Sequence, residues 1–249
     1  MTGPGQESWL SHLVELRARL VKVVLSVIAL FAVLAAFSKQ LYTLLAAPMV
    51  AALPAGSQMI ATDPLTPFST PLRLALYVAL LLAAPVFFYQ AWAFIRPALY
   101  RHEKRLAAPL LVSSMVLFYA GCAFAYFVLL PAMFKFLALA RPESVAMMPD
   151  IARYLDFVAV IALASGFSFE VPVAITLCVL LGWVTPAQLR EARGYALIAI
   201  AVVAMLITPG AGISMVLMII PMYLLYEAGI LAAASLAARP RRGTGQPGH

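Results

Sequence analysis

The chain has 249 residues, of which 64% are hydrophobic and 11% are charged, whereas an ordinary soluble domain has roughly 45–50% and about 25%. This excludes a water-facing fold, because the apolar surface exceeds what such a fold can bury. The formal net charge of +7 is common among nucleic-acid-binding proteins, but here the lysines and arginines lie in short patches between apolar runs. That pattern indicates the loops of a membrane protein, and we expect no nucleic-acid partner.

The first 20 residues form a polar, amphipathic segment without the apolar core and cleavage site of a secretory signal. Six apolar runs follow, at about residues 21–37, 74–95, 106–137, 157–183, 195–207 and 213–236. A bilayer requires about 20 apolar residues per helical crossing, and lipid cannot hydrogen-bond the backbone of an open strand. The sequence therefore predicts an all-α polytopic membrane protein with one six-helix domain over residues 21–236.

Two carboxylates lie next to the first three apolar runs. Glu15 stands four residues before Arg19, at helical i,i+4 spacing, and Glu103 lies among cations between the second and third runs. The simplest interpretation of each is a local surface ion pair, worth about 0.3–0.5 kcal/mol. Together, however, they are suited to accept the planar guanidinium forks of a peptide with adjacent arginines, which lysine cannot match. Both interpretations stay open at this point.

Four prolines fall inside apolar runs, where each removes a backbone hydrogen bond and tends to kink the helix. They are Pro85, Pro131, Pro172 and Pro221. We therefore expect kinked spans that form a concave wall. The alternative is that these prolines only reflect the general frequency of proline in transmembrane helices.

Glu170 lies in the middle of the fourth run, beside Pro172. A charge at the bilayer centre costs roughly 2.5–3.5 kcal/mol on the lenient insertion scale, so such a residue is a functional candidate by default. The alternative is a hydrogen-bonded carboxyl that holds a kink. Glu227, in the last run, lies nearer the end of its span, where we expect an interfacial position.

The fifth run has 13 residues, which span about 20 Å as a helix against a hydrocarbon thickness of about 30 Å. Either the membrane thins around this segment or a partner covers its outer end. Residues 208–212 contain proline and glycine and predict a tight turn, so the last two runs form a helical hairpin.

The distribution of positive charge predicts the topology. Twelve of the 17 lysines and arginines lie on the side that carries both termini. Under the positive-inside rule, both termini are cytoplasmic. We expect residues 237–249 to be a disordered tail on that side.

Several sequence motifs resemble those of a known protein family. The chain resembles the TatC family over about residues 9–236, in the stretches HLVELR (12–17), MIATD (59–63), YQAWAFIRPALY (89–100) with Glu103 after it, FEVP (169–172) and IPMY (220–223). Several long motifs in the same order make a chance resemblance implausible.

The resemblance implies a receptor of the twin-arginine protein export system in the bacterial inner membrane. Such a receptor binds twin-arginine signal peptides at the cytoplasmic face and assembles with single-span TatA- and TatB-type proteins in an oligomeric complex, for transport driven by the proton-motive force. By motif, Glu15 and Glu103 would receive the arginines with Arg17 and Phe94 close by, Glu170 would face the concave side, Pro48 would be a sensitive position in the first outer loop, and Met205 and Thr208 would mark a partner-docking surface.

One departure from the family concerns the turn after the fifth run. Many relatives carry an acidic residue there, whereas this chain has Gly210, Ala211 and Gly212. Any role of that acid in assembly or export therefore cannot be carried over.

Two other classes of membrane protein share some of these features. An intramembrane serine protease needs a histidine base at membrane depth, but His12, His102 and His249 all lie outside the runs, and we expect no enzyme. A small-solute or ion transporter is the more serious alternative, since an intramembrane glutamate and broken helices suit it, although no inverted repeat is visible. The two cysteines, Cys122 and Cys178, have no metal-binding spacing, and we expect neither metal nor cofactor.

Overall fold

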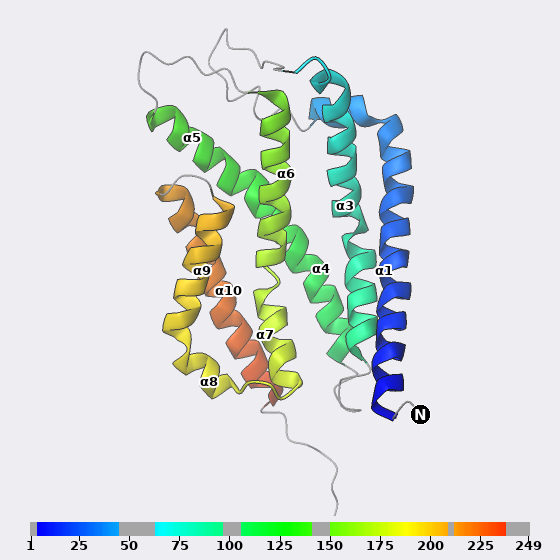
Figure 1. Ribbon diagram of the computed structural model, residues 1–249. Helices are drawn as coiled ribbons and strands as arrows, with labels where there is room; N and C mark the ends of the chain where they lie inside the picture. Colours follow the sequence, from blue (N-terminus) through cyan, green and yellow to red (C-terminus); the bar gives the residue numbers. More distant parts are fainter. Residues whose placement is uncertain (1–3, 45–62, 97–105, 141–149, 209–211, 238–249) are drawn as a thin grey trace, which may run out of the picture.

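The computed structural model describes residues 4–44, 63–96, 106–140, 150–208 and 212–237, and its regular elements there are helices (Figure 1). In chain order they are α1 (Pro4–Ala36), α3 (Thr66–Ile95), α4 (Ala107–Phe124), the π-helical turn η3 (Ala125–Leu129), α5 (Leu130–Ala140), α6 (Ile151–Ser168), α7 (Val171–Leu180), α8 (Pro186–Glu191), α9 (Arg193–Ile207) and α10 (Ile213–Ala237). A short helix also covers residues 38–44.

The described residues contain five helical segments that are long and apolar enough to cross a membrane, together with the shorter apolar helix α9. The sequence predicted six runs of which the fifth was short, and α9 confirms that shortness, since its 15 residues measure about 22 Å. The polar N-terminal segment is not a separate element, because α1 runs on from it without a break. The start of α1 and the end of α10 lie at the same end of the molecule (Figure 1).

The third span changes its helical winding halfway. Residues 125–129 form a π-helical turn, in which the Leu130 N–H donates to the carbonyl of Ala125, five residues back. Pro131 follows directly and has no N–H to continue the ordinary pattern. The sequence predicted a disturbance at this proline, but the π-helical winding was not foreseen.

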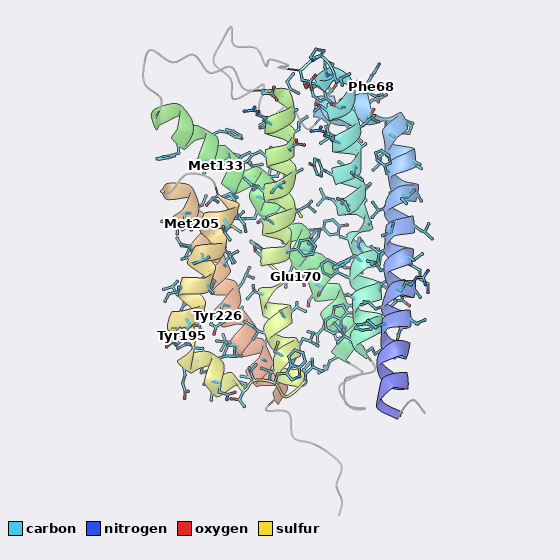
Figure 2. The ribbon with its side chains drawn as sticks, in the orientation of Figure 1. Phe68, Met133, Glu170, Tyr195, Met205 and Tyr226 are labelled. Carbon is cyan, nitrogen blue, oxygen red and sulfur yellow. The ribbon has the colours of Figure 1, made fainter. Side chains whose placement is uncertain are left out.

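The fourth span is broken between α6 and α7, at Phe169 and Glu170. The Glu170 N–H donates to the carbonyl of Phe167, a three-residue step, before α7 begins. Pro172 explains the break, since it has no N–H for the carbonyl of Ser168, four residues back. Glu170 therefore sits at an interruption of the helix, close to the middle of the bundle (Figure 2).

The crossing of α4 and α6 is close because glycines face each other there. A β-carbon at Gly121 would lie 2.7 Å from the carbonyl oxygen of Ser165 and 2.9 Å from the Cα of Gly166. The Ser165 hydroxyl donates to the Gly121 carbonyl at 2.9 Å. Small residues of this kind let membrane helices approach and bond, and here they fix the crossing of α4 and α6 just before the break at Glu170.

We therefore expect Gly121→Ala to lower the stability of the fold by about 1–3 kcal/mol, because the backbone of α6 must move to make room. Gly194→Ala is the matched control, since nothing lies within 4 Å of a β-carbon at that position in α9. Thermal unfolding in detergent measures both variants. Equal unfolding temperatures for the two alanine variants would contradict the close crossing.

Candidate functional site

A polar cluster joins α1 to the last turns of α3. Arg19 donates to Glu15 Oε1 twice, from Nη2 at 2.6 Å and from Nε at 3.0 Å. The same guanidinium donates to Gln90 Oε1 at 3.3 Å and to the carbonyl of Ala93 at 3.2 Å. Arg19 thus binds its own helix, about halfway along α1, and the last turns of the neighbouring one.

The cluster is only partly shielded from solvent. The side chains of Arg19 and Glu15 are 23% and 38% exposed, so a solute can reach the carboxylate. The local ion pair expected from the i,i+4 spacing is formed. Its two bonds are the fork that a guanidinium offers to a carboxylate, although both end on the same oxygen.

The other predicted members of this site are placed as follows. Arg17 is exposed on α1, and Phe94 is half-buried on α3, next to Ala93 of the cluster. Glu103 and Pro48 lie outside the described residues. Whether Glu15 and Glu103 share one groove therefore stays a prediction.

Glu170 is half-buried at the break between α6 and α7 (Figure 2). Its Oε1 atom is enclosed and has no hydrogen-bond partner among the described residues. The hydroxyl of Ser114 lies beside this carboxyl and accepts a hydrogen bond from Trp92 Nε1 at 3.3 Å. An enclosed carboxylate oxygen without a partner is costly, so this group is a candidate for a function that needs it.

Sequence reasoning missed the Trp92–Ser114 contact. Both residues stand in apolar runs, 22 positions apart. A buried indole N–H requires an acceptor, which was a usable signal, but several hydroxyls in the third run could have supplied it. The packing of α3 against α4 selects Ser114, which is 1% exposed.

Two further polar contacts link helices at opposite ends of the molecule. Asp156 of α6 accepts from Tyr77 at 3.1 Å and from Arg73 at 3.4 Å, both on α3. Glu227 of α10 accepts from Arg193 at 2.7 Å, at the start of α9, and from Tyr223 at 3.2 Å. The expectation that Glu227 lies towards the end of its span agrees with this pairing, which ties the short α9 to α10.

The outward face of α9 is apolar. Tyr195, Ile198, Val202 and Met205 follow one another at helical spacing and are 47–80% exposed. Thr208 differs, because it is 2% exposed and its hydroxyl donates to the carbonyl of Ala204. Of the two predicted docking residues, Met205 is thus exposed and Thr208 is buried.

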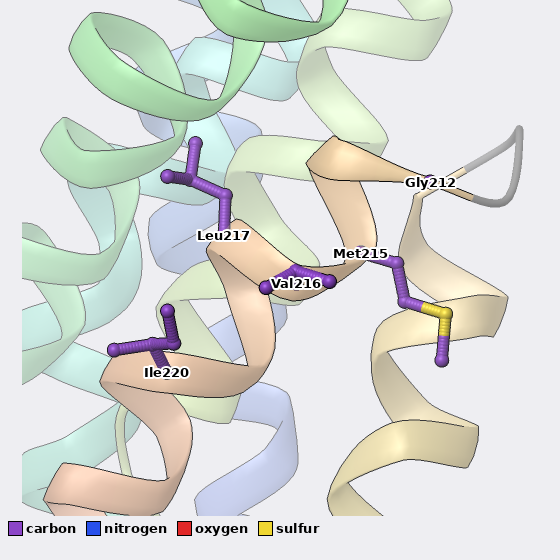
Figure 3. Close-up of a pocket in the computed structure, with 5 residues that line it drawn as sticks. All are labelled: Gly212, Met215, Val216, Leu217 and Ile220. Atoms are coloured by element: carbon purple, nitrogen blue, oxygen red, sulfur yellow. The ribbon is translucent and has the colours of Figure 1, made fainter.

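An open apolar hollow of about 560 Å³ lies at the start of α10 (Figure 3). It is lined by Gly212, Met215, Val216, Leu217 and Ile220. Gly212 adopts a φ of +141°, a conformation that favours glycine, where the chain turns into α10. None of these five residues is charged, and together they offer apolar contact.

The described residues contain no cluster of three or more histidine, cysteine or acidic side chains that could hold a metal ion. The chemistry that they do offer is recognition: a carboxylate in an arginine fork, an enclosed glutamate and an exposed apolar stripe.

The model of the family described as Sec-independent protein translocase protein (TatC) matches residues 11–221. This chain belongs to the TatC family. The motif resemblance is thereby confirmed, and the chain is a receptor subunit of a twin-arginine translocase, a transport component and not an enzyme.

Individual TatC proteins are similar in sequence to this chain over nearly its whole length. The TatC protein of Escherichia coli is 52% identical over 221 residues, which cover 89% of this chain and 86% of that protein. The TatC protein of Aquifex aeolicus is 35% identical over 233 residues, covering 93% and 96%. The chain is a multi-pass membrane protein homologous to the inner-membrane TatC of Escherichia coli.

The fold agrees as well. A crystal structure of the twin-arginine translocase receptor TatC superposes with a TM-score of 0.77 at 36% identity, covering 92% of this chain and all of that one. A second crystal structure of that receptor, in the detergent DDM, gives the same TM-score at 34% identity. The prediction of an all-α polytopic membrane protein is confirmed.

Proposed function

We propose that this chain receives the two arginines of a twin-arginine signal peptide at its cytoplasmic face, with Glu15 and Glu103 as the acceptors and Arg17 and Phe94 beside them. One observation carries the proposal: Glu15 already accepts a guanidinium fork, at 2.6 and 3.0 Å, in a position that solvent reaches. Charged hydrogen bonds contribute about 1.5–3 kcal/mol where they are partly desolvated.

The proposal places both termini in the cytoplasm. Twelve of the 17 lysines and arginines lie towards that side, and the start of α1 and the end of α10 lie at the same end of the molecule (Figure 1). The Glu15 cluster then faces the compartment in which a folded cargo protein carries its signal peptide.

Peptide binding tests the proposal against its rival. The purified chain should bind a fluorescent twin-arginine peptide and bind the same peptide with paired lysines at least about tenfold more weakly, because an ammonium cannot reproduce the fork. Vesicles that contain the chain alone should show no solute flux. Equal binding of the two peptides would overturn the receptor proposal, and solute flux would support the transporter.

We further propose that the apolar part of the peptide follows a concave wall of six kinked helices towards Glu170. The enclosed carboxylate oxygen at the break in the fourth span supports this, since a partner could still satisfy it. The membrane potential, worth about 2.3 kcal/mol per charge per 100 mV, would bias the movement.

The apolar stripe on α9 is the proposed docking surface for a single-span TatA- or TatB-type helix. Its support is the length of α9, which leaves about 8 Å of a 30 Å hydrocarbon layer unspanned. A partner helix of full length would cover the exposed Met205. Thr208 would act indirectly, by ending α9 through its bond to Ala204. The oligomeric complex and the sensitivity of Pro48 stay predictions from the family.

We expect the double variant Ile198→Ala and Met205→Ala to reduce co-purification of the single-span partner by about fivefold or more, because van der Waals packing drives helix association in lipid. The control is Val112→Ala with Val116→Ala, which also removes apolar side-chain atoms, though fewer, from exposed positions on α4. An equal loss in both double variants would mean that the effect is general and not a property of α9.

A further inference from the structure

The carboxylate proposed to receive the signal peptide already holds an arginine of the chain itself. Arg19 reaches Glu15 with two of its nitrogens, and further bonds from the same guanidinium go to Gln90 and Ala93. Only the bonds to Glu15 compete with an incoming arginine. The other two acceptors belong to α3 and would hold Arg19 after Glu15 has been taken from it.

We propose that Arg19 is a tethered competitor that occupies Glu15 in the empty receptor, gives way to an arginine of the signal peptide and thereby sets the affinity threshold for binding. This inference rests on the proposed function. It assigns Arg19 a role opposite to that of a simple support for Glu15, because its presence weakens peptide binding.

Displacing Arg19 from Glu15 breaks the same two bonds whichever residue replaces it. An incoming arginine restores the fork on Glu15, so the bonds broken and formed are alike. An incoming lysine supplies a single point charge, and its exchange ends with one hydrogen bond fewer. The competitor therefore raises the threshold for both residues by the same factor, and arginine is the residue that regains the bonds broken.

Arg19 is an effective competitor although its pair with Glu15 is partly exposed, because both residues belong to helix α1. Glu15 and Arg19 lie one helical turn apart, so the guanidinium is always present at a high local concentration. A free arginine in solution could not compete in this way.

The test compares two peptides on four forms of the full chain. A fluorescent twin-arginine peptide and its twin-lysine counterpart are titrated onto the unchanged protein, Arg19→Gln, Arg19→Lys and the control Lys22→Gln. Lys22 is exposed on α1, and its replacement removes the same charge. Fluorescence anisotropy gives the affinities, and thermal unfolding shows that each variant is folded.

We expect Arg19→Gln to bind both peptides about threefold more tightly, so that the preference for arginine stays as it is in the unchanged chain. The affinities of Arg19→Lys should lie between those of Arg19→Gln and of the unchanged chain, and this variant carries the test if Arg19→Gln does not fold. Lys22→Gln should change either affinity by less than about twofold, because its charge is exposed and screened.

Weaker binding of the twin-arginine peptide by Arg19→Gln would overturn the proposal and show that Arg19 supports Glu15. A twin-arginine affinity that Arg19→Gln leaves unchanged, or that Lys22→Gln raises equally, would overturn it too. If the unchanged chain fails to prefer arginine over lysine, the proposed function itself fails. A preference in the unchanged chain, together with an affinity that Arg19→Gln does not raise, removes only the role of Arg19.

Discussion

Replacing Glu15 with glutamine should weaken binding of a twin-arginine peptide by about tenfold. A charged hydrogen bond contributes about 1.5–3 kcal/mol, which corresponds to roughly a 10- to 150-fold change in affinity. The peptide must displace Arg19 from Glu15, and this cost offsets part of that contribution. Glutamine keeps the length of the side chain and one oxygen acceptor, so the loss isolates the negative charge. Fluorescence anisotropy with the purified chain measures the effect.

The control for this prediction is Glu191→Gln, which removes one negative charge from an exposed position on α8. It should change peptide affinity by less than about twofold, because exposed charges are screened by solvent and salt. Equal effects of the two replacements would contradict a specific role of Glu15 and leave only general electrostatic attraction.

A double-variant cycle links this prediction to the tethered competitor. Once Glu15 has been replaced, Arg19→Gln should no longer raise peptide affinity, since the carboxylate for which both guanidiniums compete is gone. The two changes should therefore be strongly non-additive. Additive effects would show that Arg19 influences the peptide elsewhere.

Glu170→Leu should lower transport in a reconstituted system by at least about tenfold and yet leave the chain as stable as before or more stable. Replacing an enclosed polar group that lacks a partner by an apolar one of similar volume removes its desolvation cost of about 1–3 kcal/mol. The Oε1 atom has no hydrogen bond to lose among the described residues. Transport of a labelled cargo and thermal unfolding together measure the two effects.

Ser114→Ala is the matched comparison, and we expect it to lower the stability of the fold, unlike Glu170→Leu. It removes both the acceptor of the buried Trp92 N–H and the hydroxyl beside Glu170, which should cost about 1–3 kcal/mol. If Glu170 only holds the kink beside Pro172, Glu170→Leu will be destabilising as well. A loss of stability and of transport in parallel would therefore contradict a separate transport role.

The sequence by itself determined the class of fold and the family. Lipid cannot satisfy an open backbone, so 64% hydrophobic residues in long runs leave helices as the solution. Run length also predicted the short α9, and prolines marked the break at Glu170 and the disturbance before Pro131. The motifs placed Glu15 and its neighbours in a known arrangement of elements.

Only the tertiary structure decided which side chains meet. It brought Arg19 onto Gln90 and Ala93, paired Trp92 with Ser114, and covered Thr208 while exposing Met205. In a soluble helix, alternation of polar and apolar residues tells which face is buried. In lipid both faces are apolar, so this signal is missing and close packing of small and polar groups between helices decides the orientation.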